Sequence, residues 1–365
     1  MRGRRVALAA FALAVGVALA GLGGCASVGY LSQSVQGHLD LLRAARPVAE
    51  WVADERTGPE LRERLLLSQR IRDFAVRELG LPDNASYRRY ADLGRPAAVW
   101  NVVAAPELSL TLRTWCYPVV GCVGYRGYFD RAAAEAQAAA LRGAGQEVSV
   151  YGVPAYSTLG KLPGEFFADP LLSTFIRYPE GELARLVFHE LAHQVAYASG
   201  DTEFNESFAT TVERIGSTRW LDREASAEAR EEYERFDARR RDFKALALAT
   251  RNRLLAIYQG SGSDEDKRAA KAAAYAEMRA EHLRLKAGPW AGYAGYDRWF
   301  ETANNASLGV QAAYNALVPG FEALFRAEDE DFPRFYAEVA RLAKLPDKAE
   351  RRAGLQRALE GRPTP

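Results

Sequence analysis

The sequence predicts an α+β protein that is predominantly α-helical, with a small β-sheet and a long antiparallel helical hairpin. Three observations support this fold class. Apolar residues recur at three-to-four spacing through much of the chain, which is the period of an amphipathic helix. The period changes in three short segments before residue 154, where we expect strands. Residues 222–286 are rich in arginine and glutamate but keep an apolar seam, which indicates two partly solvated, antiparallel helices.

The remaining elements follow from start and stop signals. Proline and glycine residues end several helical patterns, as at Gly80-Leu81-Pro82 and at Pro319-Gly320. The predicted strands are 97–103, 108–114 and 146–153. The predicted helices outside the hairpin include 31–51, 57–80, 129–142, 299–317 and two more that end near residue 358. Because no internal repeat or long linker is present, residues 25–365 are predicted to form a single domain.

The N-terminus has the pattern of a lipoprotein signal peptide over residues 1–24. Arginines at positions 2, 4 and 5 precede an apolar stretch, and Leu22-Gly23-Gly24-Cys25 then resembles a lipobox. Cys25 would become the acylated first residue of the mature protein and attach it to a membrane. We therefore expect a lipid-anchored protein of the bacterial cell envelope that faces the periplasm. An ordinary signal peptide with a coincidental cysteine is the alternative.

Composition excludes one class of partner. Lysine and arginine number 48 and aspartate and glutamate 47, for a net charge of +1, so the chain lacks the basic surface that nucleic-acid binding requires. Apolar residues make up 48% of the chain, which is enough for a substantial core.

The two other cysteines, Cys116 and Cys122, are six residues apart and are flanked by Pro118 and Gly121. In an exported protein this spacing favours a local disulfide that closes a short loop. Two ligands of a separate metal site are the alternative, although no histidine lies nearby.

The motif that carries chemistry is His189-Glu190-Leu191-Ala192-His193, within a helical pattern. Residues four apart lie on one face of a helix, so His189 and His193 can bind one zinc ion through their imidazole nitrogens. Glu190 lies beside them without ligating the metal, as a general base for a water molecule requires. An amphipathic core helix with two incidental histidines is the alternative.

A zinc ion that acts in hydrolysis needs three protein ligands and one open position. Glu206, in Asn205-Glu206-Ser207-Phe208-Ala209, is the nearest suitable donor downstream, after a turn at Gly200. Glu203 is the rival third ligand. Glu213 lies two turns beyond Glu206 and is either a carboxylate that orients a histidine ligand or a solvated helix charge. Glu165 and Asp169, in the loop before the motif, are interpreted as surface charges, and binding of a substrate amine is the alternative.

These motifs resemble a known family. His189-Glu190-Leu191-Ala192-His193 followed by Asn205-Glu206-Ser207-Phe208-Ala209 is similar to the gluzincin metallopeptidases, which carry H-E-x-x-H and a later N-E-x-x-A. More specifically, the chain resembles a bacterial lipoprotein family of putative aminopeptidases, through Gly37-His38-Leu39, Trp115-Cys116-Tyr117-Pro118, Asn304-Asn305-Ala306 and Tyr314. The G-x-M-E-N segment that holds a substrate's amino group in related enzymes has no counterpart, because the only methionines are Met1 and Met278.

The resemblance implies a zincin-like catalytic core and a zinc aminopeptidase that hydrolyses peptides, with one Zn²⁺ per chain. His189, His193 and Glu206 would be the zinc ligands, Glu190 the base, and Tyr314 the residue that stabilises the oxyanion, with core packing as the alternative role of Tyr314. A zinc endopeptidase of the same chemistry is one alternative. A non-catalytic lipoprotein scaffold with a structural zinc is another, although a structural site has no use for a base at Glu190.

Overall fold

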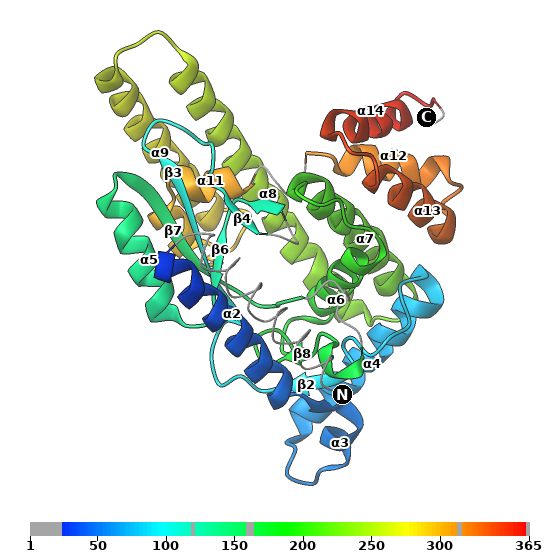
Figure 1. Cartoon of the computed structure of the whole chain (residues 1–365). Helices are drawn as coiled ribbons and strands as arrows, with labels where there is room; N and C mark the ends of the chain where they lie inside the picture. Colours follow the sequence, from blue (N-terminus) through cyan, green and yellow to red (C-terminus); the bar gives the residue numbers. More distant parts are fainter. Residues whose placement is uncertain (1–23, 118–120, 158–163, 312–315, 363–365) are drawn as a thin grey trace, which may run out of the picture.

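The computed structural model describes residues 24–117, 121–157, 164–311 and 316–362 (Figure 1). Residues 1–23 of the predicted signal peptide and the predicted catalytic residue Tyr314 lie outside these described residues. The described chain is mainly helical with three small sheets, which confirms the predicted α+β class.

Helices make up most of the described chain, apart from the strand-rich stretch between α4 and α5. The helices are α2 (Gly24–Ala44), α3 (Val48–Ala53), α4 (Pro59–Leu79), α5 (Arg131–Gly143), α6 (Glu180–Val195), α7 (Thr202–Arg223), α8 (Ala227–Gln259), α9 (Asp264–Ala287), α10 (Asp297–Thr302), α11 (Asn305–Gln311), α12 (Val318–Ala327), α13 (Phe332–Ala343) and α14 (Lys348–Leu359), with a short 3-10 turn, η1 (Glu165–Phe167). The strands are β1 (Arg46–Pro47), β2 (Arg89–Ala91), β3 (Val99–Pro106), β4 (Trp115–Tyr117), β5 (Gly121–Val123), β6 (Arg126–Tyr128), β7 (Gln146–Val153) and β8 (Leu171–Leu172).

The main sheet has β3 at its centre, between β6 and β7, with both pairs antiparallel. The pairing of β3 with β7 runs from Val99 opposite Val153 to Pro106 opposite Gln146. The alternation that predicted strands at 97–103 and 146–153 therefore identified the two long strands. The predicted strand 108–114 is wrong. That segment turns at Glu107 and returns along β3 with a single backbone hydrogen bond, from the Arg113 N–H to the Ala104 oxygen at 2.8 Å, because β6 already occupies that edge of β3 over Trp100–Val102.

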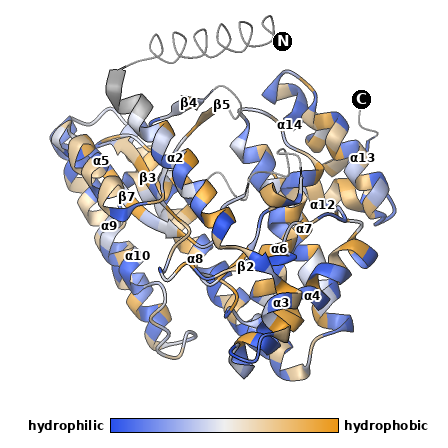
Figure 2. Ribbon diagram, turned by 60° about the horizontal axis from the view of Figure 1, so that its bottom comes forward, coloured by the Kyte–Doolittle hydropathy of each residue, from blue (hydrophilic) through white to orange (hydrophobic). Residues whose placement is uncertain are grey.

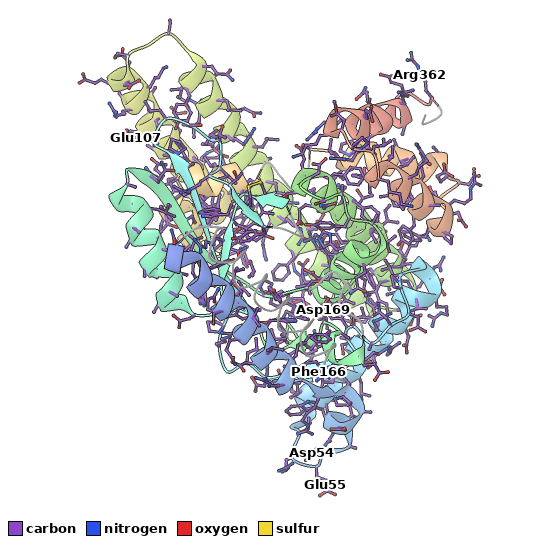
Figure 3. The ribbon with its side chains drawn as sticks, in the orientation of Figure 1. Asp54, Glu55, Glu107, Phe166, Asp169 and Arg362 are labelled. Carbon is purple, nitrogen blue, oxygen red and sulfur yellow. A yellow bond between two sulfur atoms is a disulfide. The ribbon has the colours of Figure 1, made fainter. Side chains whose placement is uncertain are left out.

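Helices α8 and α9 form the long hairpin predicted for residues 222–286 (Figure 1). Ser263 starts α9 with a capping box, in which its hydroxyl accepts from the Asp266 N–H and the Asp266 carboxylate accepts from the Ser263 N–H. Salt bridges attach α9 to the end of the sheet, from Arg268 to Glu107 and from Lys271 to Glu147. Figure 3 shows Glu107 at the outer end of this contact.

The predicted helix 299–317 is interrupted. Helix α10 ends at Thr302, and α11 begins at Asn305 because the Asn304 side chain accepts from the Ala306 and Ser307 N–H groups. Asn305 is fully buried and bonds to both sides of this junction. Its amide donates to the Pro106 and Glu107 carbonyls, and its side-chain oxygen accepts from the hydroxyls of Tyr258 and Tyr275. The Asn304-Asn305 pair thus joins the hairpin to the sheet.

The largest hydrophobic cluster surrounds α6 and α7. Gly216 of α7 permits close packing there, because a Cβ at this position would lie 2.7 Å from Leu79 and 2.9 Å from Phe188. Figure 2 shows hydrophilic residues on the outer helices and hydrophobic residues along β3. No helix of the described chain combines the length and the apolar character needed to cross a bilayer.

The C-terminal helices hold the start of α7. Arg351 of α14 forms a salt bridge with Asp201 at 2.8 Å, and only 4% and 2% of the two side chains are exposed. Asp201 is also the N-cap of α7, since it accepts from the Phe204 N–H. The neighbouring Arg352 pairs with Glu203 in a more exposed position.

We predict that Arg351→Met lowers the free energy of unfolding by about 3–5 kcal/mol, because it leaves the buried Asp201 carboxylate without its cation. Arg352→Met is the matched control, on the same helix and with the same change of charge. Its half-exposed ion pair should contribute at most about 1 kcal/mol. Urea unfolding of the two variants measures both values, and equal losses would contradict this account of α14.

Candidate metal centre

Helix α6 places its two histidines on one face. Proline at 179 precedes the helix, and Glu180 and Glu182 lie in its first turn, where carboxylates favour the helix N-terminus. Leu183, Val187 and Leu191 are fully buried and fix which face points into the core. The four-residue spacing then brings the rings of His189 and His193 together edge to face, with their centroids 4.8 Å apart.

Three donor atoms converge at this point. The Nε2 atoms of His189 and His193 are 3.2 Å apart, and Glu206 Oε2 lies 3.3 Å from the first and 3.8 Å from the second. A tetrahedral ion with bonds of about 2.0–2.1 Å keeps its ligand atoms about 3.3 Å apart, so the cluster has the dimensions of a metal site. The structure thus brings together the three residues predicted as ligands, and together they can hold one metal ion.

The connection from α6 to α7 delivers Glu206. Helix α6 ends at Val195, Gly200 takes a positive φ of 73°, and α7 begins at Thr202. The buried Asn205 side chain fixes this connection, because it accepts from the Ala198 N–H at 2.7 Å and donates to the Ala198 oxygen at 2.9 Å. Sequence reasoning assigned Asn205 no role of its own, and its place in the motif is explained by this pair of bonds.

Glu203, the rival third ligand, is engaged elsewhere. Its carboxylate pairs with Arg352 of α14, and Glu203 is not among the clustered donors of the described residues. The geometry therefore favours Glu206 over Glu203.

Glu213 is a buried partner of a ligand and not a solvated charge. Only 6% of its side chain is exposed, and its Oε2 lies 2.9 Å from His189 Nδ1. Its other oxygen accepts from Arg185 Nε at 2.9 Å. Burial opposes ionisation of Glu213, yet Arg185 and His189 together lower its pKa to about 2. The anion therefore accepts a hydrogen bond from His189 Nδ1, which leaves Nε2 as the ring nitrogen that faces the donor cluster.

Glu190 lies beside the cluster without joining it. Burial raises the pKa of its carboxyl group to about 7, and the charge of Glu206 adds to this effect while His189 opposes it. A carboxylate with a pKa near neutrality is suited to accept and return a proton.

Asp169 is buried, with 1% of its surface exposed, so its interpretation as a surface charge is wrong. Its carboxylate accepts from the Ser157 hydroxyl at 2.8 Å, and Figure 3 shows it near the middle of the molecule. Gln194, directly after the second histidine, donates to the Ser86 hydroxyl and accepts from Asn84. These bonds connect the end of α6 to the loop before β2.

The cysteines lie in separate places. Cys116 and Cys122 form a disulfide that joins the paired strands β4 and β5. Gly121 of this hairpin packs against the α6–α7 connection, where its added Cβ would lie 3.1 Å from Gly200 Cα. Cys25 belongs to the first turn of α2.

Three tyrosines near Glu206 were not identified from the sequence. Burial raises the pKa of the hydroxyls of Tyr125, Tyr151 and Tyr197, and the charge of Glu206 contributes to each shift. All three hydroxyls therefore lie close enough to Glu206 for its charge to act on them. The glycine- and tyrosine-rich stretch 121–128 was the only sequence signal that pointed to one of them.

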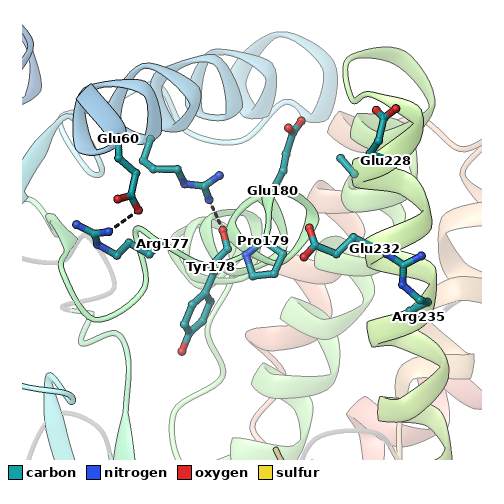
Figure 4. A pocket seen from close by; sticks show the side chains of 10 residues that line it. Glu60, Arg177, Tyr178, Pro179, Glu180, Glu228, Glu232 and Arg235 are labelled. Carbon is teal, nitrogen blue, oxygen red and sulfur yellow. Dashed lines mark hydrogen bonds and ion pairs between the residues drawn. The ribbon is translucent and has the colours of Figure 1, made fainter. Parts of the chain in front are cut away.

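A surface pocket lies at the opposite end of α6 (Figure 4). It has a volume of about 490 Å³ and is lined by glutamates and arginines, including Glu60, Arg177 and Glu232. Nine residues of helix separate Glu180, at its edge, from His189, a distance of about 14 Å along the axis. This pocket is therefore distinct from the donor cluster.

We predict that His189→Ala, His193→Ala and Glu206→Ala each abolish stoichiometric binding of a divalent metal ion, because each removes one of three donors. Glu203→Ala is the control and should retain full occupancy. Metal analysis after dialysis against Zn²⁺ measures the occupancy. Full occupancy in Glu206→Ala together with loss in Glu203→Ala would reverse the assignment.

Comparison with known proteins gives one match. The family model described as "Putative aminopeptidase" matches residues 29–355, which is most of the chain. No curated protein and no solved structure shows significant similarity to this chain. On this match the chain belongs to the putative aminopeptidase family.

Proposed function

We propose that the protein is a zinc-dependent aminopeptidase with a zincin-like, gluzincin-type centre, anchored by lipid in the bacterial cell envelope. The observation that carries the proposal is the convergence of His189 Nε2, His193 Nε2 and Glu206 Oε2, with Glu190 beside them. The family match supports peptidase activity. The zinc ion, the mechanism and the location are proposed from the residues.

The donor set favours zinc. Two imidazole nitrogens and one carboxylate oxygen are the protein ligands of many catalytic zinc sites, in which a fourth position stays open. The orphaned Nδ1 of His193, buried without a hydrogen-bond partner among the described residues, is compatible with a ring whose other nitrogen binds an ion. When bound, zinc lowers the pKa of a water molecule to about 7 and polarises a carbonyl group.

The residues of the chain then supply the proton transfers. The Glu190 carboxylate takes a proton from the attacking water and later donates it to the leaving amine. Glu213 holds His189 in one orientation through its bond to Nδ1. Tyr314 remains the proposed oxyanion-stabilising residue. Among the described residues that follow it, the Leu317 N–H donates to the hydroxyl of Ser207, which comes directly after Glu206 in α7.

The proposed substrate is a peptide, and the proposed location is the periplasmic face of an envelope membrane. The basic start, apolar stretch and lipobox of residues 1–25 support export and acylation at Cys25. Cys25 belongs to α2, so the proposed anchor leads directly into a helix that contacts β2 and β6.

We predict that Glu190→Gln keeps zinc and thermal stability but lowers peptide hydrolysis by at least 10²-fold, within the 10²–10⁴-fold range of a positioned acid–base group. The substitution preserves size and polarity and removes only the basic carboxylate. Glu203→Gln, the same change at the residue paired with Arg352, should leave hydrolysis near the wild-type rate. The assay measures release of the first residue from peptides, together with metal content.

Two results would contradict the proposal. Loss of zinc from Glu190→Gln would make this residue part of the metal shell. Absence of cleavage by the wild type, with both free and blocked amino termini, would favour a structural zinc in a scaffold. Cleavage of blocked peptides alone would indicate an endopeptidase.

We also predict that Cys25→Ser prevents lipid attachment and leaves an unprocessed precursor or a released soluble form. Labelling of cells with a fatty acid, followed by isolation of the protein, measures the modification. Cys122→Ser serves as the control, because a cysteine in the disulfide should not affect acylation. Equal labelling of Cys25→Ser and the wild type would rule out the lipobox.

A further inference from the structure

A chain of ion pairs leads from the metal centre to the helical hairpin. Glu213 bonds to His189 on one side and to Arg185 on the other. Arg185 in turn lies 3.6 Å from Glu182, one turn earlier on α6. Glu182 then receives two hydrogen bonds from Arg240 of α8, at 2.7 and 2.9 Å. Every link joins side chains that are 17% exposed or less.

The geometry of these pairs is directional. Arg185 donates both Nε and Nη2 to one oxygen of Glu213, which leaves the other oxygen for His189 Nδ1. Arg240 donates from its two terminal nitrogens to the two carboxylate oxygens of Glu182, and this pair of hydrogen bonds fixes the plane of the carboxylate. Helix α8 also packs closely against the start of α6. At Gly181 there is no room for a side chain, since a Cβ there would lie 2.5 Å from Tyr233 of α8.

Stability alone does not account for this arrangement. Buried ion pairs give little net stability compared with apolar side chains of similar volume, since the cost of desolvation offsets their attraction. Buried ion pairs do, however, fix the orientation of neighbouring groups, and a metal site depends on the orientation of its ligands. A carboxylate that accepts from a ligand histidine sets the orientation of the imidazole ring and its basicity.

We propose that Arg185 is a positioning residue of the metal centre and that, through Glu182 and Arg240, helix α8 contributes to metal affinity. This inference rests on the proposed function. It assigns the hairpin a role in the site, in addition to its attachment to the sheet through Lys271 and Asn305. Neither Arg185 nor Arg240 belongs to the donor cluster.

The test compares the zinc affinity of purified full-length variants, measured by competition with a chromogenic chelator. Arg185→Met should weaken Zn²⁺ binding by about 10- to 100-fold, as expected when a group that orients a ligand is lost. Arg185→Lys keeps the positive charge but lacks the planar guanidinium group, so its zinc affinity should lie between those of Arg185→Met and the wild type. Arg240→Met should cause a smaller loss, about 3- to 10-fold.

Arg253→Met is the matched control. Arg253 also belongs to α8 and pairs with a glutamate, Glu277, but that pair is exposed and lies away from α6. The zinc affinity of Arg253→Met should equal that of the wild type. If the ion pairs from Glu213 to Arg240 act as one unit, their effects are not independent. The double variant Arg185→Met/Arg240→Met should then lose less zinc affinity than the two single losses combined.

Two further measurements separate positioning from folding. Thermal unfolding of the metal-free variants reports their stability, and the visible spectrum of the Co²⁺-loaded protein reports the geometry of the ligands. Lower zinc affinity with a changed Co²⁺ spectrum, in variants that remain folded, supports the inference. Unchanged zinc affinity and spectrum in Arg185→Met and Arg240→Met overturn it while leaving the proposed function intact. Failure of the wild type to bind zinc would overturn both.

Discussion

The structure depends on one constraint: three side chains that could hold a metal ion must meet inside a hydrophobic core. His189, His193 and Glu206 come from two helices that pack within the largest hydrophobic cluster. Helices α6 and α7 can approach closely because Gly216 carries no side chain. The polar atoms at their contact must then be paired with one another or with an ion, since an unpaired buried group costs free energy. Arg185, Glu213 and Asn205 are the residues that satisfy this condition around the cluster.

The features predicted from the sequence are those that depend on residues close together in the chain. Helical spacing alone places His189 above His193, and a turn at Gly200 brings the next helix back, so the ligand set could be identified without a structure. Spacing favoured Glu206 over Glu203, but the structural reason was hidden, because Glu203 is engaged by Arg352, about 150 residues further along the chain. The burial of Glu213 was equally hidden, since a glutamate on a helix looks the same in sequence whether it faces solvent or Arg185.

Errors in the predicted elements have the same origin. The segment 108–114 alternates like a strand, but β6 occupies the edge with which it would pair. The helix expected at 299–317 follows its apolar period correctly yet breaks at Asn304, whose side chain caps a new helix and also donates to Val148 of β7. Asp169 looked like a loop charge and is buried beside α6 because its backbone oxygen and carboxylate bond to the Tyr87 N–H and the Ser157 hydroxyl. Each correction comes from a partner distant in sequence.

The elements that hold the three donors also explain why the donors converge. Asn205 and the Arg351–Asp201 pair fix the backbone before Glu206. Glu213 fixes the ring of His189, and α8 reaches that carboxylate through Arg240, Glu182 and Arg185. Ligand atoms 3.2–3.8 Å apart already have nearly the separation that a tetrahedral ion imposes. An ion that enters such a site has little ordering of side chains left to impose, so more of the coordination energy remains as affinity.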